Sequence, residues 1–306
     1  MTLPVLIDTL VKTLQIGSMY ALMALGITLT MSVIKLPNFA HAEYITVGAY
    51  TALLVSMGLS TNPLVILGLA FVVSAGVALA SHIVVFRPLE KRNPSTYAML
   101  LASFAVGLIL RYILFIFADH FNLFDKRPQI PLQVIFRSPI MILSNIFFLV
   151  VPTSIIAVII LTLLLNFTAL GREMRALANN YNLAKIIGIR VERVKTLTWL
   201  LVGGLAGIAG ALWGIYSNVA PLTGWLAILS VFAAAILGGM SSFVGTILGA
   251  YLVAFSENTV MQLLNQYLGL DFSFKPAIPF VIIIIVLLIR PQGLTGFFSR
   301  KRELSR

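Results

Sequence analysis

Long runs of apolar residues constrain this chain more than any other feature of its sequence. We identify nine of them, at residues 8–34, 39–58, 63–86, 95–117, 146–167, 195–218, 226–240, 244–264 and 277–290. Several reach the roughly 20 residues that an α-helix needs to cross a bilayer. Only 10% of the residues are charged, whereas a soluble domain usually carries about a quarter. The sequence therefore predicts an all-α polytopic bundle of about eight to nine membrane segments, forming one membrane domain over residues 1–306.

One of these segments is short for a membrane helix. The 15 residues of 226–240 would extend over only about 22 Å as an α-helix, less than the ~30 Å hydrocarbon core. This segment is either a half-helix or a re-entrant element, and such elements occur in membranes only where protein covers them or where they line a cavity.

Basic residues gather in three loops. Residues 87–94, 171–196 and 290–306 hold fourteen of the chain's 21 Lys and Arg residues. These loops lie on the same side of the membrane if all nine segments cross it, and the positive-inside rule makes that side cytoplasmic. The net charge of +11 is then explained by these loops, so we expect a multi-pass protein of the cell membrane, in contact with lipid, and no nucleic-acid partner.

The segment 171–196 is the longest polar stretch between the apolar runs. Within it, residues at near-helical spacing predict one amphipathic helix that Gly188 ends as a C-cap glycine. The residues with this spacing are Met174, Leu177, Ala178, Tyr181, Ala184 and Lys185. Such a helix docks on a partner protein or lies on anionic lipid at the membrane surface, and the physical pattern leaves both possibilities open.

Motifs for catalysis, nucleotide binding and metal binding are absent from the sequence. No G-x-x-x-x-G-K-[ST] or H-E-x-x-H occurs, so we expect no P-loop and no zinc protease site. The chain has no cysteine, and its three histidines, His41, His82 and His120, lack metal-ligand spacing. We therefore expect neither an enzyme nor a metal site.

A few charged residues fall at or near membrane depth, where charge is costly and often functional. For Glu43 and Glu257, structural hydrogen bonding and a direct role in transport remain open. For Arg111 we expect the side chain to extend toward the outer interface, with its charge in the polar region.

Small residues recur in the later segments. Gly203 and Gly207, Gly210 and Gly214, and Gly245 and Gly249 each lie four residues apart. This spacing places both glycines of a pair on one helix face and predicts close helix–helix packing.

Several stretches, in order along nearly the whole chain, resemble one family of membrane proteins. They are "IGSMYALMALGITL" (16–29), "NFAHAEYITVGAY" (38–50), Gly171-Arg172 followed by Ala184 to Gly188, "LAGIAG" (205–210), "AAAILGGMSSFVGTILGA" (233–250) and "LIRPQGLTG" (288–296). These stretches are similar to motifs of ABC-importer permeases, in particular those for branched-chain amino acids. The chain resembles the smaller of that family's two permeases.

The resemblance implies an ATP-driven importer of leucine, isoleucine and valine. A second permease, a longer homologue, would complete the pore, and an extracytoplasmic binding protein would deliver the substrate. Two cytoplasmic ABC ATPase subunits would use the ATP, so this chain itself would need no cofactor. The segment 171–196 would couple to the ATPases, through Arg172, Arg175, Ala178, Tyr181, Ala184 and Gly188.

Under the same resemblance, polar groups beside helix breaks are candidates for the substrate pathway, because half-helix ends stabilise ionic groups. The candidates are Asn38, His41 and Glu43 after Pro37, Ser241 and Ser242 after Gly238-Gly239, and Glu257. The residues at the two breaks could instead only satisfy backbone groups that the breaks leave free.

Three alternative functions remain. Importers of urea and short-chain amides share these permease motifs. An ion-coupled secondary amino-acid carrier would be expected to have inverted repeats and several buried carboxylates, and neither is evident. A membrane scaffold whose basic loop binds anionic lipid is the third.

Overall fold

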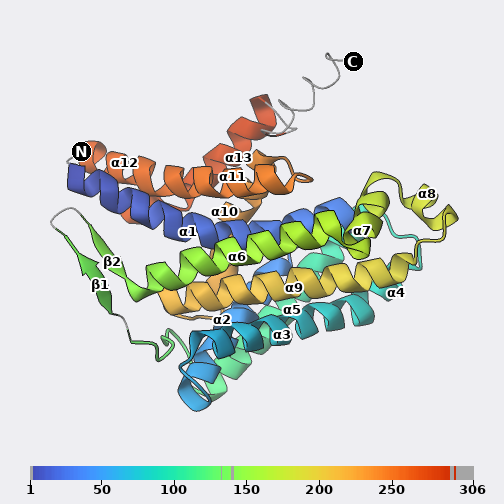
Figure 1. The fold of residues 1–306 in the computed structure, drawn as a ribbon, viewed down its shortest axis with the longest axis horizontal. Coiled ribbons are helices and arrows are strands. Elements are labelled where there is room, and N and C mark those ends of the chain that lie inside the picture. Colours follow the sequence, from blue (N-terminus) through green and yellow to red (C-terminus); the bar gives the residue numbers. More distant parts are fainter. Residues whose placement is uncertain (1–2, 132, 139–140, 290–292, 294–306) are drawn as a thin grey trace. The chain divides into compact units, whose positions relative to one another are not determined.

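The computed structural model describes residues 3–131, 133–138, 141–289 and 293 (Figure 1). Apart from Gly293, the predicted closing motif and basic tail from residue 290 onward lie outside the described residues. Helices make up most of the described chain, so the predicted all-α class is confirmed. Its elements are α1 (Leu3–Leu29), η1 (Thr30–Ile34), α2 (His41–Gly58), α3 (Pro63–Ser81), η2 (His82–Phe86), α4 (Arg87–Glu90), α5 (Thr96–His120), β1 (Val134–Arg137), β2 (Ile142–Ser144), α6 (Asn145–Phe167), α7 (Ala169–Asn179), α8 (Tyr181–Ile186), α9 (Val191–Tyr216), α10 (Thr223–Gly238), α11 (Phe243–Phe255), η3 (Ser256–Val260), α12 (Met261–Leu268), η4 (Phe272–Phe274) and α13 (Ala277–Ile289).

Seven helices in the described part of the chain are long and apolar enough to cross a membrane. They are Leu6–Ile34, Pro63–Glu90, Thr96–His120, Asn145–Phe167, Val191–Tyr216, Phe243–Leu268 and Phe272–Ile289. The helix α2 is more polar and is not one of the seven. At 16 residues α10 is a shorter apolar helix, and its length of about 24 Å falls short of the hydrocarbon core. A polytopic bundle is therefore confirmed, whereas the expected count of eight to nine membrane segments is not.

The loop between α5 and α6 contains the only strands among the described residues, and we did not predict them. The strands β1 and β2 pair antiparallel, with Val134 opposite Ser144 and Arg137 opposite Ile142. Each has only three or four residues, so their alternation is too short to recognise in the sequence.

Local capping explains where the long helices begin. The Asn62 side chain accepts a hydrogen bond from Leu64 N at 2.9 Å, and Pro63 occupies the first turn of α3. Ser95 caps α5 by accepting from Ala98 N at 3.2 Å. Asn and Ser are favoured at this position because they satisfy N–H groups that the first turn leaves unpaired.

The chain forms two compact units. The first comprises Met1–Thr28, Pro131–Ser154 and Leu229–Arg306, and the second comprises Leu29–Ile130 and Ile155–Ile228. Helices α6 and α10 contribute residues to both units. The description of residues 1–306 as one permease domain stays a prediction.

Close packing of α2, α3 and α9 forms the core of the second unit. A Cβ atom at Gly207 would overlap the Ala70 carbonyl of α3, and one at Gly210 would overlap the Ile45 carbonyl of α2. Glycine is needed at both positions because the backbones approach too closely for any side chain. The predicted close packing through these glycines is therefore confirmed.

Polar contacts supplement the packing of the first unit. The hydroxyl groups of Thr28 and Thr246 lie 2.7 Å apart, and those of Ser18 and Tyr251 lie 2.9 Å apart. At Gly249 of α11, a Cβ atom would overlap the Ala234 carbonyl of α10. Hydroxyl pairs and small residues are the usual means by which helices associate in lipid, where hydrophobicity alone gives no preference.

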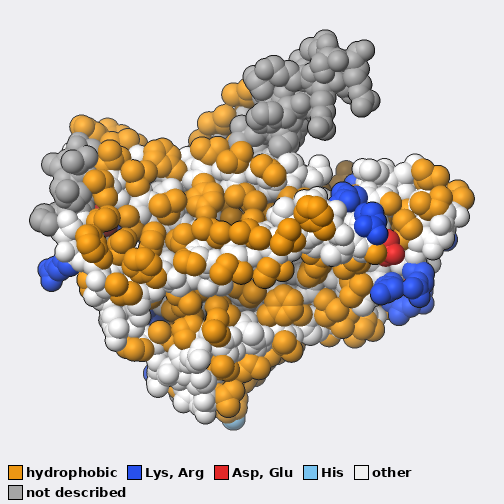
Figure 2. Space-filling view, in the orientation of Figure 1, with side chains coloured by type: hydrophobic (Ala, Val, Ile, Leu, Met, Phe, Trp, Pro, Cys, Tyr) orange, Lys and Arg blue, Asp and Glu red, His pale blue; other side chains and the backbone are white. Residues whose placement is uncertain are grey.

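Large apolar side chains are exposed on the outer faces of the helices, as expected for surfaces that contact lipid. Ile116 and Leu101 of α5 are examples. Figure 2 shows hydrophobic side chains along the helices of the face in view, while Lys and Arg side chains gather around α4 and α7. These basic residues belong to two of the three loops predicted to be cytoplasmic, 87–94 and 171–196, both in the second unit.

Candidate functional site

The break between η1 and α2 is stabilised mainly by a side chain from another helix. Lys35 adopts a left-handed conformation with φ 62°, and this ends η1. Ser103 of α5 donates to the Pro37 carbonyl at 3.2 Å and accepts from Phe39 N at 3.2 Å. Ser103 therefore satisfies backbone groups that the break leaves free. Sequence analysis missed Ser103, because nothing near it in the chain indicates a break 66 residues away.

The break also leaves polar side-chain atoms without protein partners. Asn38 is fully buried, and its Oδ1 and Nδ2 atoms form no hydrogen bond of normal geometry among the described residues, although the side chain interacts electrostatically with Tyr44. His41 is equally buried at the first residue of α2. A buried amide that lacks well-formed hydrogen bonds costs free energy, so Asn38 is an unusual residue for the interior of the second unit.

Glu43 forms a buried ion pair with Arg111, which corrects our expectation for that arginine. The Arg111 Nε and Nη2 atoms lie 2.9 and 2.7 Å from Glu43 Oε1. The guanidinium also lies 4.0 Å from the ring centroid of Trp225. Arg111 does not extend to an interface, because a buried carboxylate and an aromatic face attract its charge more strongly. Glu43 is 0% exposed, and its Oε2 atom has no partner among the described residues.

The second predicted break, between α10 and α11, depends on glycine and serine. Gly239 has φ +87°, and a side chain at Gly238 would overlap the Gly245 backbone. Ser242 caps α11 by accepting from Gly245 N at 3.1 Å. Ser242 therefore has a structural role, which was one of the two interpretations left open, while the side chain of Ser241 is exposed.

Glu257 is the buried carboxylate of the first unit. It lies in η3 and is 2% exposed. Tyr20 Oη donates to Glu257 Oε2 at 3.0 Å, and Ser230 Oγ donates to Oε1 at 2.5 Å. Among the described residues, no Lys, Arg or His forms an ion pair with it. Two hydroxyl groups therefore donate to this carboxylate, and the half-buried Lys275 attracts it from beyond ion-pair distance.

The predicted pathway residues thus fall into two groups. Asn38, His41 and Glu43 belong to the second unit, and Ser241, Ser242 and Glu257 belong to the first. The structure brings Glu43 together with Arg111, and Glu257 together with Tyr20 and Ser230, within each unit.

The predicted amphipathic helix of segment 171–196 is divided into α7 and α8. Asn180 interrupts it with extended backbone angles, φ −152° and ψ 105°, and its side chain accepts from Leu183 N at 3.0 Å. Asparagine competes with helical hydrogen bonding in this way, which explains why one helix was the wrong expectation. The predicted stop at Gly188 is confirmed, with φ +86°.

The C-terminus of α8 has the geometry of a Schellman motif. Gly188 N donates to the Lys185 carbonyl at 3.2 Å, and Ile189 N donates to the Ala184 carbonyl at 3.1 Å. Only a residue that tolerates positive φ fits at position 188. With Asn180 capping the other end, this short helix is held at both termini.

The turn from α6 into α7 explains the Gly171-Arg172 opening. A Cβ atom at Gly171 would overlap the Leu165 carbonyl. Thr168 caps α7 by accepting from Gly171 N at 3.1 Å, and the Arg175 side chain donates to the Leu165 carbonyl. Arg172 is exposed. Arg175 therefore helps to hold the turn, while Arg172 projects to the outside.

The residues of the predicted coupling segment differ in how deeply they are buried. Met174, Leu177 and Ala184 are each only 1% exposed, and α7 packs against η1 and α9. Ala178 is half-buried, and Gly188 is exposed. Tyr181, which was predicted, is exposed, and beside it in the sequence lie three exposed apolar residues that were not predicted, Leu183, Ile186 (80% exposed) and Ile187. The helix α8 has only six residues, so its periodicity did not indicate which side faces inward.

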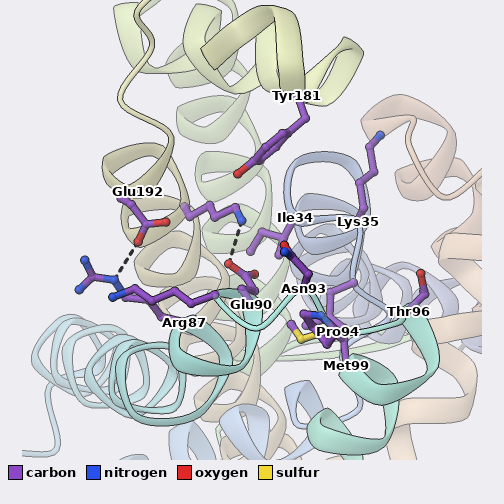
Figure 3. Close-up of a pocket in the computed structure, with 13 residues that line it drawn as sticks. Ile34, Lys35, Arg87, Glu90, Asn93, Pro94, Thr96, Met99, Tyr181 and Glu192 are labelled. Atoms are coloured by element: carbon purple, nitrogen blue, oxygen red, sulfur yellow. Dashed lines mark hydrogen bonds and ion pairs between the residues drawn. The ribbon is translucent and has the colours of Figure 1, made fainter. Parts of the chain in front are cut away.

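A polar pocket lies next to α8 in the second unit (Figure 3). Its volume is about 440 Å³, and its charged lining residues are Lys35, Arg87, Glu90, Lys91, Glu192 and Lys195. Arg87 pairs with Glu192 and Lys195 pairs with Glu90, both at 2.8 Å. Tyr181 reaches from α8 toward the second pair, and Lys195 Nζ lies 5.3 Å from its ring centroid.

Comparisons with known proteins point to one family. The family described as "Branched-chain amino acid transport system / permease component" matches residues 9–289. The chain is 34% identical over 289 residues to the "Probable branched-chain amino acid transport permease protein LivH" of Methanocaldococcus jannaschii, covering 93% of this chain and 91% of that protein. It is 29% identical over 306 residues to the high-affinity branched-chain amino acid transport system permease protein BraD of Pseudomonas aeruginosa, covering 95% of both. It is 25% identical over 303 residues to the ribose import permease protein RbsC of Escherichia coli, covering 92% of this chain and 85% of that protein.

Proposed function

Because this chain belongs to the branched-chain amino acid transport permease family, we propose that it forms part of the pore of an ATP-driven importer of leucine, isoleucine and valine. The observation that carries the proposal is the family match over residues 9–289, nearly the whole chain. We place the protein in the cell membrane, where an importer must reside. The ATP would be hydrolysed by partner subunits, in line with the absence of a P-loop motif from the sequence.

The proposed assembly contains four further subunits of three kinds. A second permease, a longer homologue, would complete the pore, and two cytoplasmic ABC ATPases would bind to the pair. An extracytoplasmic binding protein would supply the amino acid. The predominantly apolar outer faces of the helices would contact membrane lipid.

The helix α8 supports coupling to an ATPase. It exposes Leu183, Ile186 and Ile187, with the basic residues Lys185 and Arg190 beside them. Apolar side chains with a basic surround are a typical docking surface for a partner groove. Since both ends of α8 are capped, the helix would move as a rigid body when a bound ATPase changes conformation.

The burial of Ala184 changes how the coupling prediction should be tested. A large side chain there would disturb the chain's own packing, because Ala184 is 1% exposed. A loss of coupling in such a variant could come from a lost contact with the ATPase or from a disturbed fold of the permease itself. The exposed residues of α8 avoid this problem.

For the substrate pathway, we propose one leading candidate in each unit, Asn38 in the second and Glu257 in the first. Asn38 is a candidate because it is a buried amide at a helix break, and Glu257 because it is a buried carboxylate with hydroxyl donors and no ion pair among the described residues. His41, Glu43, Ser241 and Ser242 would line or gate the path from positions close to these two residues in the sequence.

The test is co-purification of the chain with its partners from native membranes. In the variant Ile186→Asp, we expect recovery of the ATPase to fall by about 10- to 100-fold, because burial of an isoleucine contributes about 1.5–3 kcal/mol. The matched control is Asn182→Asp, which adds the same charge to an exposed polar position of α8. It should retain the ATPase to within about threefold of wild type.

Uptake measurements in the same cells identify the substrate. Radiolabelled leucine uptake should be lost with Ile186→Asp and inhibited by excess isoleucine or valine. Inhibition by urea, acetamide or ribose instead would contradict the amino-acid assignment. Uptake by the purified chain alone, driven by an ion gradient in proteoliposomes, would contradict the ATP-driven mechanism and support a secondary carrier.

A further inference from the structure

The pocket beside α8 contains two more basic than acidic residues, and its two ion pairs leave two lysines without an acidic partner among the described residues. Four of its lining residues are basic and two are acidic. Arg87 and Lys195 are engaged by Glu192 and Glu90. Among the residues that the structure describes, Lys35 and Lys91 form no ion pair and no side-chain hydrogen bond. The pocket is therefore a concave site with a net charge of +2 (four basic minus two acidic residues), suited to an anionic group.

The other lining residues add hydrogen-bond donors rather than further charge. Thr96 begins α5, a helix of 25 residues, and Ser95 caps it. The start of a long helix carries a partial positive charge that favours anions nearby. Asn93, with φ 49°, lies on the turn before this helix and lines the pocket with Thr96. Figure 3 shows both residues on the side of the pocket that Lys35 also borders.

Exposed apolar side chains follow or precede the pocket-lining residues in the sequence. Val84 precedes Arg87 by three residues and is 72% exposed, and Tyr97 follows Thr96 and is 81% exposed. Leu101, one helical turn further into α5, is exposed as well. These residues belong to helices long and apolar enough to span a membrane. A molecule with an anionic head in the pocket would thus have an apolar surface beside it for its tail.

We propose that this pocket binds the phosphate group of an anionic phospholipid. Lys35 and Lys91 attract the phosphate, Asn93 and Thr96 donate hydrogen bonds to it, and the acyl chains lie along α5 and η2. The two ion pairs, Arg87–Glu192 and Lys195–Glu90, join α4 to α9 and hold the pocket walls in place. Basic pockets at the cytoplasmic ends of membrane helices suit such headgroups. The site is independent of the transported substrate.

Native mass spectrometry of the full chain in detergent tests the proposal, with phosphatidylglycerol titrated against phosphatidylcholine. The pocket variant is Lys35→Gln with Lys91→Gln. Since each lysine near an anionic lipid contributes a factor of roughly five, we expect roughly thirtyfold weaker phosphatidylglycerol binding by this variant. The matched control is Arg92→Gln with Arg193→Gln, two exposed arginines that do not line the pocket. It removes the same charge and should weaken binding by less than about threefold.

A conservative variant separates loss of charge from damage to the fold. Lys35→Arg with Lys91→Arg keeps both charges and should bind phosphatidylglycerol nearly as well as the wild type. Equal weakening in the pocket and control variants would show general surface attraction and overturn the proposal. Equal binding of the two lipids by the wild type would also overturn it and leave the two lysines to an acidic protein partner. Displacement of phosphatidylglycerol by an equal concentration of inorganic phosphate would assign the pocket to free phosphate and overturn the lipid assignment.

Discussion

Glu43 and Glu257 are both buried among apolar helices, one in each compact unit, but their carboxylates are stabilised differently. Glu43 is matched by Arg111, whose guanidinium also lies over Trp225. Glu257 receives hydrogen bonds from Tyr20 and Ser230, and no described residue forms an ion pair with it. Arg111 neutralises the charge of the Glu43 carboxylate within the protein. The hydroxyl groups neutralise no charge on the second carboxylate, and Lys275 attracts it only from beyond ion-pair distance. In the function proposed above, Glu257 is therefore the carboxylate that would receive the ammonium group of an amino acid.

The largest effect is expected when Arg111 loses its charge. The variant Arg111→Met leaves Glu43 buried without a counter-ion, which costs about 3–5 kcal/mol. We expect the free energy of unfolding, measured by denaturant titration in mixed micelles, to fall by that amount. Cells expressing this variant should also contain less folded protein.

A double variant shows whether the ion pair itself or the unpaired charge causes this effect. Arg111→Met combined with Glu43→Leu removes both charges and should restore most of the stability, since well-packed apolar residues often replace a buried pair at little cost. A double variant as unstable as the single one would show that Arg111 stabilises the protein by packing on Trp225 rather than by its charge. The contrast drawn between Glu43 and Glu257 would then be wrong.

A smaller effect is expected when Glu257 loses one of its hydroxyl donors. Tyr20→Phe removes the hydrogen bond to Oε2 and should lower the free energy of unfolding by about 1.5–3 kcal/mol, the range for hydrogen bonds to charged groups. The matched control is Tyr251→Phe in the same unit, which removes a bond to the neutral hydroxyl of Ser18. It should cost about 0.5–1.5 kcal/mol. Equal costs for the two variants would show that Glu257 gains nothing from this donor as an ionised group.

The smallest effect on stability is expected for Glu257→Gln. Tyr20 and Ser230 can each donate or accept, so the two hydroxyl groups can satisfy an amide, and we expect a loss within about 1 kcal/mol. Leucine uptake should nevertheless fall by about tenfold, because the amide offers no charge to the ammonium group. The paired variant Glu43→Gln should do the opposite and destabilise the protein by leaving Arg111 buried and unpaired. Unchanged uptake with Glu257→Gln would remove Glu257 from the substrate pathway.

The helical fold could be predicted because its determinants lie close together in the chain. Each run of apolar residues corresponds to a helical element, and Gly188 ends α8 where the sequence indicated a C-cap. The breaks after Pro37 and Gly239 also occur as expected. Proline lacks an N–H, and glycine tolerates positive φ, so these effects depend on single residues. The paired strands β1 and β2 escaped prediction because each has only three or four residues.

The candidate site was predictable only as a set of residue types. From the sequence, Glu43 and Glu257 were recognised as unusual, but the same two roles were considered for both. Arg111 was predicted to extend toward an interface, whereas it pairs with Glu43. For α8 it indicated an amphipathic element but selected Ala184, which is buried, and overlooked Ile186 and Ile187. A buried polar residue is recognisable by its type, whereas its partner depends on contacts between distant parts of the chain.

By itself, the sequence determined that the chain is a polytopic membrane protein, where most of its long apolar helices lie, and which polar residues are costly to bury. These properties follow from transfer free energies and backbone preferences, which are nearly local. Only the tertiary structure decided that Arg111 pairs with Glu43, 68 residues away, and that Tyr20 donates to Glu257, 237 residues away. It also decided which side of α8 is exposed. The physical reason is that a buried charge or an apolar helix face interacts with the residues that lie within a few ångströms of it. Which residues those are depends on the packing of helices that are far apart in the sequence.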